Sequence, residues 1–229
     1  MIDPIVTEAE WRPILHSLPE WRCPIVPVVV ISPHPDDETL ATGGLIATLS
    51  DRNLDTTVVA VTDGESAYED VKGLGEVRKD EQKKALQILG VRASKTVRFG
   101  MPDSGVSAHH QKLVDNLLTV VSPGSHILAP WCGDFHPDHE ACGRAAEEVS
   151  RLIGARLTYY FFWTWHRGAI DHLAGKPIRK FPLSVEAMCA KTEALLCHES
   201  QLHRNGGDPI LPERLLGPAR RPFEVYLDA

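Results

Sequence analysis

The sequence predicts an α/β fold: a single domain with a mostly parallel sheet and helices on both of its faces. From residue 25 onward, short apolar runs typical of buried strands alternate with amphipathic stretches typical of helices. The length of 229 residues suits one such domain, because two independent domains would both be small. With 43% hydrophobic and 24% charged residues, the composition is that of a globular protein with a sizeable core. The expected arrangement is Rossmann-like, since crossover helices cover both faces of a parallel sheet.

The expected elements alternate along the chain. Short runs rich in β-branched or aromatic residues predict strands over 26–31, 56–61, 95–99, 126–130 and 157–163. Stretches with helical periodicity predict helices over 39–51, 76–89, 109–121 and 140–153. Gly90 and Gly154 follow two of these helices, in the position where glycine favours a helix end. The pattern is weaker after Trp165, where we expect a helix over 184–198 and a short last strand over 221–227.

The first 24 residues differ from the rest of the chain. They contain several prolines together with Trp11 and Trp21. We expect residues 1–24 to form an irregular or short-helical lead-in that packs on the domain formed by residues 25–229.

Charge and hydropathy exclude several classes of partner. The formal net charge is −7, and no stripe of lysine and arginine is available to neutralise phosphates, so a nucleic-acid partner is not expected. The chain has no apolar run of 18 residues and no signal-peptide pattern at its start, which predicts a soluble, cytoplasmic protein with no membrane partner. The five cysteines form no Cys-x-x-Cys pair, so neither a disulfide framework nor a thiolate zinc site is expected.

A dense group of ionisable residues follows the first predicted strand. His34, Asp36, Asp37 and Glu38 come within five positions, directly after an apolar run. Burying such groups is costly unless something at that strand end needs their charge, and a bound cation is the most economical explanation. Carboxylates at the start of a helix also stabilise it, and this alternative would account for Asp36 or Glu38. It would not account for the histidine.

A second group, Asp134-Phe-His-Pro-Asp-His139, follows the predicted strand 126–130. Because ligands bind at the carboxyl ends of parallel strands, we expect both groups to meet at one edge of the sheet. The spacing of three between His34 and Asp37 places them on one side of a turn, and His136 and His139 repeat that spacing. These four side chains could close a structural zinc site, whereas a catalytic site keeps an open position for water. The additional Asp36 favours a hydrolase, which needs a base to take a proton from that water.

These motifs resemble a known family. His-Pro-Asp-Asp-Glu at 34–38, Gly43-Gly44, and His-Pro-Asp-His at 136–139 resemble the PIG-L/LmbE-like N-acetylglucosamine deacetylases. The resemblance extends to Arg78 within 78–91, to Asp103 in Pro-Asp-Ser-Gly, and to Lys191 through Gln201, so it covers roughly residues 25–201.

The resemblance implies roles for these residues. One zinc ion per chain would be bound by His34, Asp37 and His139, although two histidines and a carboxylate also suit iron(II). Asp36 would be the general base, and His136 would polarise the carbonyl or stabilise the oxyanion. Whether Asp36 alone or Asp36 with His136 handles both proton transfers stays open. Two further residues, Arg78 and Asp103, would bind the polar part of the substrate.

The implied reaction removes the acetyl group from an N-acetylated amino sugar or a conjugate of one, which gives acetate and a free amine. The alternative substrates are amides with a longer acyl group or a thiol conjugate, and the non-enzyme alternative is a closed structural zinc site. Homo-oligomerisation is left open by the resemblance.

Other side chains carry weaker expectations. Glu38 is expected to support the start of the helix that follows it, and Cys132 to be a small buried residue. Trp131 is a candidate for stacking on a sugar ring. We expect the aromatic run 159–165 to be mostly a core strand, with Trp165 and His166 emerging at its end. His198 is expected to have a packing or capping role.

Overall fold

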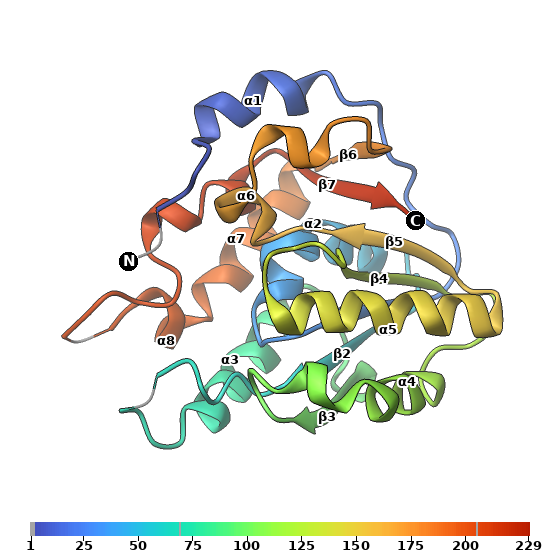
Figure 1. The fold of residues 1–229 in the computed structure, drawn as a ribbon, viewed down its shortest axis with the longest axis vertical. Coiled ribbons are helices and arrows are strands. Elements are labelled where there is room, and N and C mark those ends of the chain that lie inside the picture. Colours follow the sequence, from blue (N-terminus) through green and yellow to red (C-terminus); the bar gives the residue numbers. More distant parts are fainter. Residues whose placement is uncertain (1–2, 69, 205) are drawn as a thin grey trace.

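The computed structural model describes residues 3–68, 70–204 and 206–229 and contains one seven-stranded sheet with the strand order β3-β2-β1-β4-β5-β7-β6 (Figure 1). The strands are β1 (Val28–Ser32), β2 (Thr56–Thr62), β3 (Thr96–Met101), β4 (His126–Pro130), β5 (Arg156–Tyr160), β6 (Ile178–Pro182) and β7 (Phe223–Asp228). All neighbouring pairs from β3 through β5 are parallel, and β7 is antiparallel to both β5 and β6. The predicted α/β fold with a mostly parallel sheet is therefore confirmed.

Helices cover both faces of the sheet. The α-helices are α1 (Glu8–His16), α2 (Asp37–Asp51), α3 (Leu74–Ile88), α4 (His110–Leu118), α5 (Pro137–Ile153), α6 (Thr164–Arg167), α7 (Val185–Leu196) and α8 (Glu199–Leu202). Short 3-10 turns are η1 (Ala93–Lys95), η2 (Val106–His109), η3 (Ile170–Leu173), η4 (Glu213–Leu215) and η5 (Pro218–Arg220). Within the described residues, none of the helices is long and apolar enough to cross a membrane.

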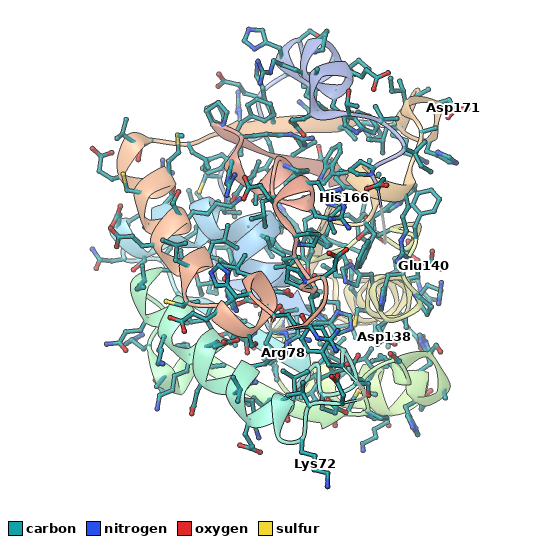
Figure 2. The ribbon with its side chains drawn as sticks, turned by 90° about the vertical axis from the view of Figure 1, so that its left-hand side faces the viewer. Lys72, Arg78, Asp138, Glu140, His166 and Asp171 are labelled. Atoms are coloured by element: carbon teal, nitrogen blue, oxygen red, sulfur yellow. The ribbon has the colours of Figure 1, made fainter. Side chains whose placement is uncertain are left out.

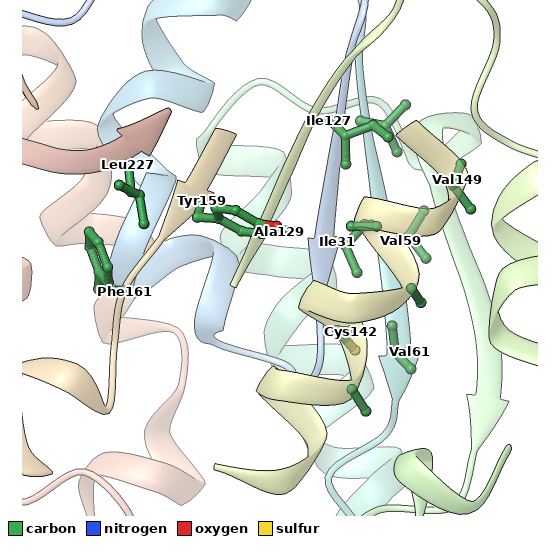
Figure 3. Packing of buried hydrophobic residues seen from close by; sticks show 14 of the residues in the cluster. Ile31, Val59, Val61, Ile127, Ala129, Cys142, Val149, Tyr159, Phe161 and Leu227 are labelled. Carbon is green, nitrogen blue, oxygen red and sulfur yellow. The ribbon is translucent and has the colours of Figure 1, made fainter. Parts of the chain in front are cut away.

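Two hydrophobic cores lie on opposite faces of the sheet. On one face, side chains of α1, α4 and α5 pack against the strands, and on the other face those of α2, α3 and α7 do so. Figure 3 shows the first core, where Ile31, Val59 and Ile127 of three strands lie against α5 with its Cys142 and Val149. All five residues of β1 are buried, because the strand is covered on both faces. Because β1 is buried on both sides, its carboxyl end is held in place, and the first ionisable group, residues 34–38, follows directly after this end.

The N-terminal segment packs on the outside of the sheet. It contains α1, whose Trp11 is buried and meets Trp165 edge-on with ring centroids 5.3 Å apart. Trp21 is also buried, and its indole N–H donates to Asp228 at 3.1 Å. The division of the chain into a lead-in of residues 1–24 and one domain of residues 25–229 stays a prediction.

Several element boundaries differ from the sequence prediction, and three of these differences bear on the strand ends described below. Helix α2 begins at Asp37, before position 39, and α5 begins at Pro137, before position 140. Proline fits the first helical turn because the N–H that it lacks would have no helical partner there. The strand predicted over 157–163 ends at Tyr160, because the N–H groups of residues 162–164 donate to the carboxylate of Asp134. Helix α6 follows instead.

Candidate metal centre and active site

The two ionisable groups meet at the carboxyl ends of β1 and β4, which are neighbours in the sheet. This edge lies on the left-hand side of Figure 1 and faces the viewer in Figure 2. His34 lies on the connection from β1 to α2, while His136 directly precedes α5 and His139 lies in its first turn. The ring centroid of His34 is 5.0 Å from that of His136 and 5.4 Å from that of His139. Two loops about a hundred residues apart in the sequence therefore form one site.

The imidazoles of His34 and His139 converge on one carboxylate oxygen, which belongs to Asp37. Asp37 Oδ2 lies 3.2 Å from His34 Nδ1 and 3.2 Å from His139 Nε2. One ligand atom from each of these three residues lies within 4.8 Å of the others. His139 Nε2 is buried and has no hydrogen-bond partner within the described part of the chain, although buried polar atoms nearly always have one. The residues thus fit a metal ion, which would give this nitrogen a partner.

A second group that could hold a metal is formed by His34, His136 and Asp138. Its atoms already have other partners. Asp138 accepts hydrogen bonds from the backbone N–H groups of Ser104 at 2.8 Å and Val106 at 3.1 Å, and its own N–H donates to His136 Nδ1 at 3.2 Å. Asp138 Oδ2 also lies 3.3 Å from His34 Nε2. Asp138 was missed by the sequence reasoning, although it lies inside the His-Pro-Asp-His motif.

Asp36 is buried, lines the cavity described below, and lies beside Arg78, with 3.6 Å between Oδ2 and Nη2. Burial, together with the charge of Asp37, raises the pKa of Asp36 to about 7, although Arg78 opposes the shift. Its side chain makes no capping hydrogen bond to α2. The helix-capping interpretation therefore fails for this carboxyl group.

Glu38 is wholly buried beneath the site. It accepts hydrogen bonds from Ser32 Oγ at 2.6 Å and Gln82 Nε2 at 3.0 Å, and burial raises its pKa. Glu38 lies in the first turn of α2, as expected for a residue that supports the helix start, and its carboxyl group also ties α2 to β1 and α3.

Arg78 of α3 is buried and belongs to a hydrogen-bond network next to Asp36. It donates to the Gly64 carbonyl at 2.9 Å and to Gln201 Oε1 at 3.0 Å. Gln201 in turn donates to the carbonyl of Pro35 at 2.6 Å. The network fixes the loop that carries His34 and Asp36, and sequence reasoning assigned no role to Gln201. Nearby, His198 is buried with Nε2 3.3 Å from Thr39 Oγ1, as expected for a packing role.

Asp103 reaches the site from the loop after β3. Its Oδ1 lies 3.3 Å from His34 Nε2, and its Oδ2 accepts the N–H of Ser66 at 2.9 Å. Although burial opposes the shift, these contacts and the charge of His34 hold the pKa of Asp103 at about 2. Asp103 is therefore a carboxylate at the wall of the cavity.

A cavity of about 120 Å³ opens beside these groups. Its lining residues are His34, Asp36, Asp37, Ala67, Arg78, Asp103, Ser104, His136, Phe162, Trp163, Ile210 and Leu211. The Trp163 ring is nearly parallel to that of His136, with an angle of 16° and 5.8 Å between centroids, and the Arg167 guanidinium lies 4.1 Å from the Trp163 centroid. The cavity thus combines a polar floor with an apolar wall.

The aromatic residues expected at the site were misplaced. Trp165 and His166 are buried, with 4% and 1% of their surface exposed, and do not emerge at the strand end. Trp131 packs edge-on against Phe161 and carries Lys176 over its ring. Trp163 lines the cavity because the chain leaves the sheet after Tyr160, earlier than predicted. Cys132 is only partly buried and lies 3.7 Å from Glu147.

The pKa values of His34 and His139 reflect an excess of negative charge around these two residues. Burial would lower the pKa of His139, but Asp37 and Asp134 raise it to about 9. The pKa of His34 is likewise raised, against the effect of burial, by Asp103, Asp138 and Asp37. Such an excess of carboxylates also attracts a divalent cation. His136 differs, because burial and the neighbouring histidines lower its pKa to about 4.

A mostly parallel sheet with histidines, carboxylates and a cavity at its carboxyl edge is the arrangement in which α/β enzymes place their active sites. Residues 29–150 match the PIG-L family, described as GlcNAc-PI de-N-acetylase. The chain belongs to this family, and the prediction that the protein is a deacetylase enzyme is confirmed.

Two named relatives and one solved structure are similar to this chain. The chain is 27% identical over 220 residues to a probable N-acetyl-alpha-D-glucosaminyl L-malate deacetylase 2 of Bacillus anthracis, covering 87% of this chain and 94% of the relative. It is 40% identical over 219 residues to a 1D-myo-inositol 2-acetamido-2-deoxy-alpha-D-glucopyranoside deacetylase of Corynebacterium glutamicum, covering 76% and 74%. The N,N'-diacetylchitobiose deacetylase of Pyrococcus horikoshii shares the fold, with a TM-score of 0.63, 22% identity, and coverage of 88% of this chain and 82% of that one.

Proposed function

We propose that this protein is a zinc-dependent hydrolase that removes the acetyl group from an N-acetylated amino sugar or a conjugate of one. The observation that carries the proposal is the convergence of His34, Asp37 and His139 next to Asp36, a buried carboxyl group that faces the same cavity. The named relatives act on N-acetylated glucosamine derivatives, which supports the substrate class.

His34, Asp37 and His139 would hold the metal. The alternative group through His136 and Asp138 is disfavoured, because the Asp138 carboxylate oxygens already accept hydrogen bonds from backbone N–H groups. Two histidines and one carboxylate are a ligand set of catalytic zinc, and iron(II) suits the same set. When bound, the metal supplies Lewis acidity, which lowers the pKa of water and polarises a carbonyl oxygen.

Asp36 is the general base in this proposal. It accepts a proton from the attacking water while the water oxygen bonds to the amide carbon. When the carbon–nitrogen bond breaks, the protonated carboxyl group of Asp36 can return the proton to the departing amine. A carboxyl group whose pKa is raised by burial is suited to both transfers.

His136 would stabilise the oxyanion as a neutral donor. Its Nδ1 accepts the backbone N–H of Asp138, so the proton of the neutral ring lies on Nε2. The lowered pKa keeps the ring neutral near pH 7. A neutral ring in the cavity wall can therefore donate a hydrogen bond to the carbonyl oxygen of the substrate.

Arg78 and Asp103 would contact the polar part of the substrate, since both line the cavity. Most small-molecule pockets exceed roughly 300 Å³, whereas this cavity measures about 120 Å³. It therefore suits the reacting amide with a small acyl group, while the rest of a conjugate stays outside. The assay below distinguishes acetyl from the alternative of a longer acyl or thiol-conjugate amide.

The test combines metal analysis with product release. Purified protein is assayed for bound zinc and for acetate released from a panel of N-acetylated amino sugars, sugar conjugates and longer-acyl amides. Asp36→Asn should retain zinc and lose activity by a factor of roughly 10² to 10⁴. Asp171→Asn, at an exposed carboxylate on η3, is the matched control. Unchanged acetate release by Asp36→Asn with zinc bound would overturn the mechanism.

A further inference from the structure

Asp134 is a wholly buried carboxylate with an unusual set of partners. It accepts hydrogen bonds from three consecutive backbone N–H groups, those of Phe162 at 3.2 Å, Trp163 at 3.1 Å and Thr164 at 2.9 Å. The Thr164 hydroxyl adds a fourth donor at 2.6 Å, and His139 Nδ1 lies 2.8 Å from Asp134 Oδ2. Among the described residues, no lysine or arginine forms an ion pair with Asp134. Its charge is stabilised by these donors instead.

The contact with His139 determines where the imidazole proton resides. A carboxylate only accepts, so in the neutral ring the proton lies on Nδ1 and points at Asp134. The lone pair is then on Nε2, the nitrogen that faces Asp37 and has no hydrogen-bond partner. A carboxylate behind a histidine fixes both the tautomer and the orientation of a metal-binding ring.

The other contacts shape the cavity wall. By accepting the N–H groups of residues 162–164, Asp134 turns the chain away from the sheet after Tyr160. This turn places Trp163 in the cavity wall and nearly parallel to His136. One carboxylate therefore contacts both the candidate metal ligand and the segment that forms the apolar wall.

We propose that Asp134 is a positioning residue that prepares His139 for metal binding and holds the Trp163 wall in place. The first part rests on the proposed function, in which His139 is a ligand. The two parts are linked because one carboxylate contacts both partners, His139 through Oδ2 and the N–H groups of residues 162–164.

The test measures zinc affinity of the full-length protein by competition with a chelator, alongside urea unfolding of the metal-free forms. In Asp134→Asn, the two carboxylate oxygens are replaced by one carbonyl oxygen and one amide N–H₂ group, so the side chain can no longer accept hydrogen bonds from His139 and from residues 162–164 through both of its ends. This variant should bind zinc roughly 10- to 100-fold more weakly than the wild type. Thr164→Val is the matched control, because it removes one donor to Asp134 without touching His139. It should lower stability and leave zinc affinity unchanged.

The outcomes separate the hypotheses. If both variants lose stability but Asp134→Asn keeps wild-type zinc affinity, Asp134 has only a structural role and the inference is overturned. If the wild type itself binds no zinc, the proposed function fails, and the metal-positioning role of Asp134 fails with it. A measurement on the wild type does not depend on the variant folding: in ¹⁵N NMR, His139 of the zinc-bound protein should carry its proton on Nδ1. A proton on Nε2 would contradict the inference.

Discussion

Three consecutive acidic residues at the site have three different environments. Asp37 touches two imidazoles, and although burial opposes the shift, His139 and His34 hold its pKa well below the usual range. Asp36, one position earlier, has its pKa raised to about 7 by burial and by the charge of Asp37. Glu38 accepts hydrogen bonds from Ser32 and Gln82 beneath both. Side-chain direction on the first turn of α2 therefore separates a candidate ligand, a candidate base and a structural contact.

The two histidines of the second loop should respond differently to substitution. His136→Ala should retain zinc and lose acetate-releasing activity by a factor of roughly 10² to 10³, because an oxyanion donor is removed. His139→Gln should lose zinc. Metal content after dialysis and acetate release measure the two effects. If His136→Ala loses zinc while His139→Gln keeps it, the metal is bound by the group that contains Asp138 instead.

His126 should make the protein sensitive to acid. Burial and the charge of Arg156 lower its pKa to about 4, and its Nε2 lies 2.9 Å from Thr158 Oγ1. A histidine with a lowered folded-state pKa contributes stability that is present above pH 6.5 and lost as pH falls toward 4. Between pH 7 and pH 5 this single group should cost about 2 kcal/mol of unfolding free energy.

The variant His126→Asn isolates this contribution. The free energy of unfolding is measured with urea at pH 7 and at pH 5. Between these two pH values it should fall by about 2 kcal/mol less in the variant than in the wild type. The comparison uses the change with pH, so the cost of the substitution itself cancels. Equal losses in both proteins would show that His126 does not titrate in this range.

The buried carboxylate of Glu224 holds helix α2 to the last strand and forms an ion pair with α7. The backbone N–H groups of Gly44 and Leu45 donate to Glu224 of β7 at 2.8 and 2.9 Å, and Lys191 of α7 donates to the same carboxylate at 2.7 Å. A side chain on Gly44 would meet Leu183 at 2.5 Å, so glycine permits the close approach of Leu183 to α2. The Gly43-Gly44 pair and Lys191 of the motifs thus belong to one helix–strand junction.

Removing one member of this pair should be strongly destabilising. Glu224→Gln leaves the Lys191 ammonium buried without a countercharge and should cost about 3–5 kcal/mol in urea unfolding. The double variant Glu224→Gln with Lys191→Met should recover part of this loss, because no unpaired charge remains. If the double variant is as unstable as the sum of the single variants, the ion pair does not account for the effect.

The sequence predicts those parts of the molecule that depend on local patterns. Alternating apolar and amphipathic runs are sufficient for the sheet and its helices, and His34, Asp37 and His139 are recognisable because each lies in a short motif after a strand. The contact from Asp134 to residues 162–164 spans about thirty positions and ends β5 early. The bond from Gln201 to Pro35 crosses most of the chain. Neither contact leaves a periodic signal in the sequence. The place of Trp163 in the cavity wall and the contacts of Gln201 and Asp134 could therefore be found only from the three-dimensional structure.

Metal binding should stabilise the whole domain, because the candidate ligands come from two separate loops and the surrounding carboxylates repel one another without a cation. At a free zinc concentration 100 times the dissociation constant, the gain is about 2.7 kcal/mol. For a chain of this size that gain raises the unfolding temperature by about 5–11 °C. Calorimetry of the chelator-treated protein, with and without added zinc, measures the shift. His34→Ala should abolish it, since only a chain with the complete ligand set gains this stability. An equal shift in His34→Ala would place the stabilising zinc elsewhere.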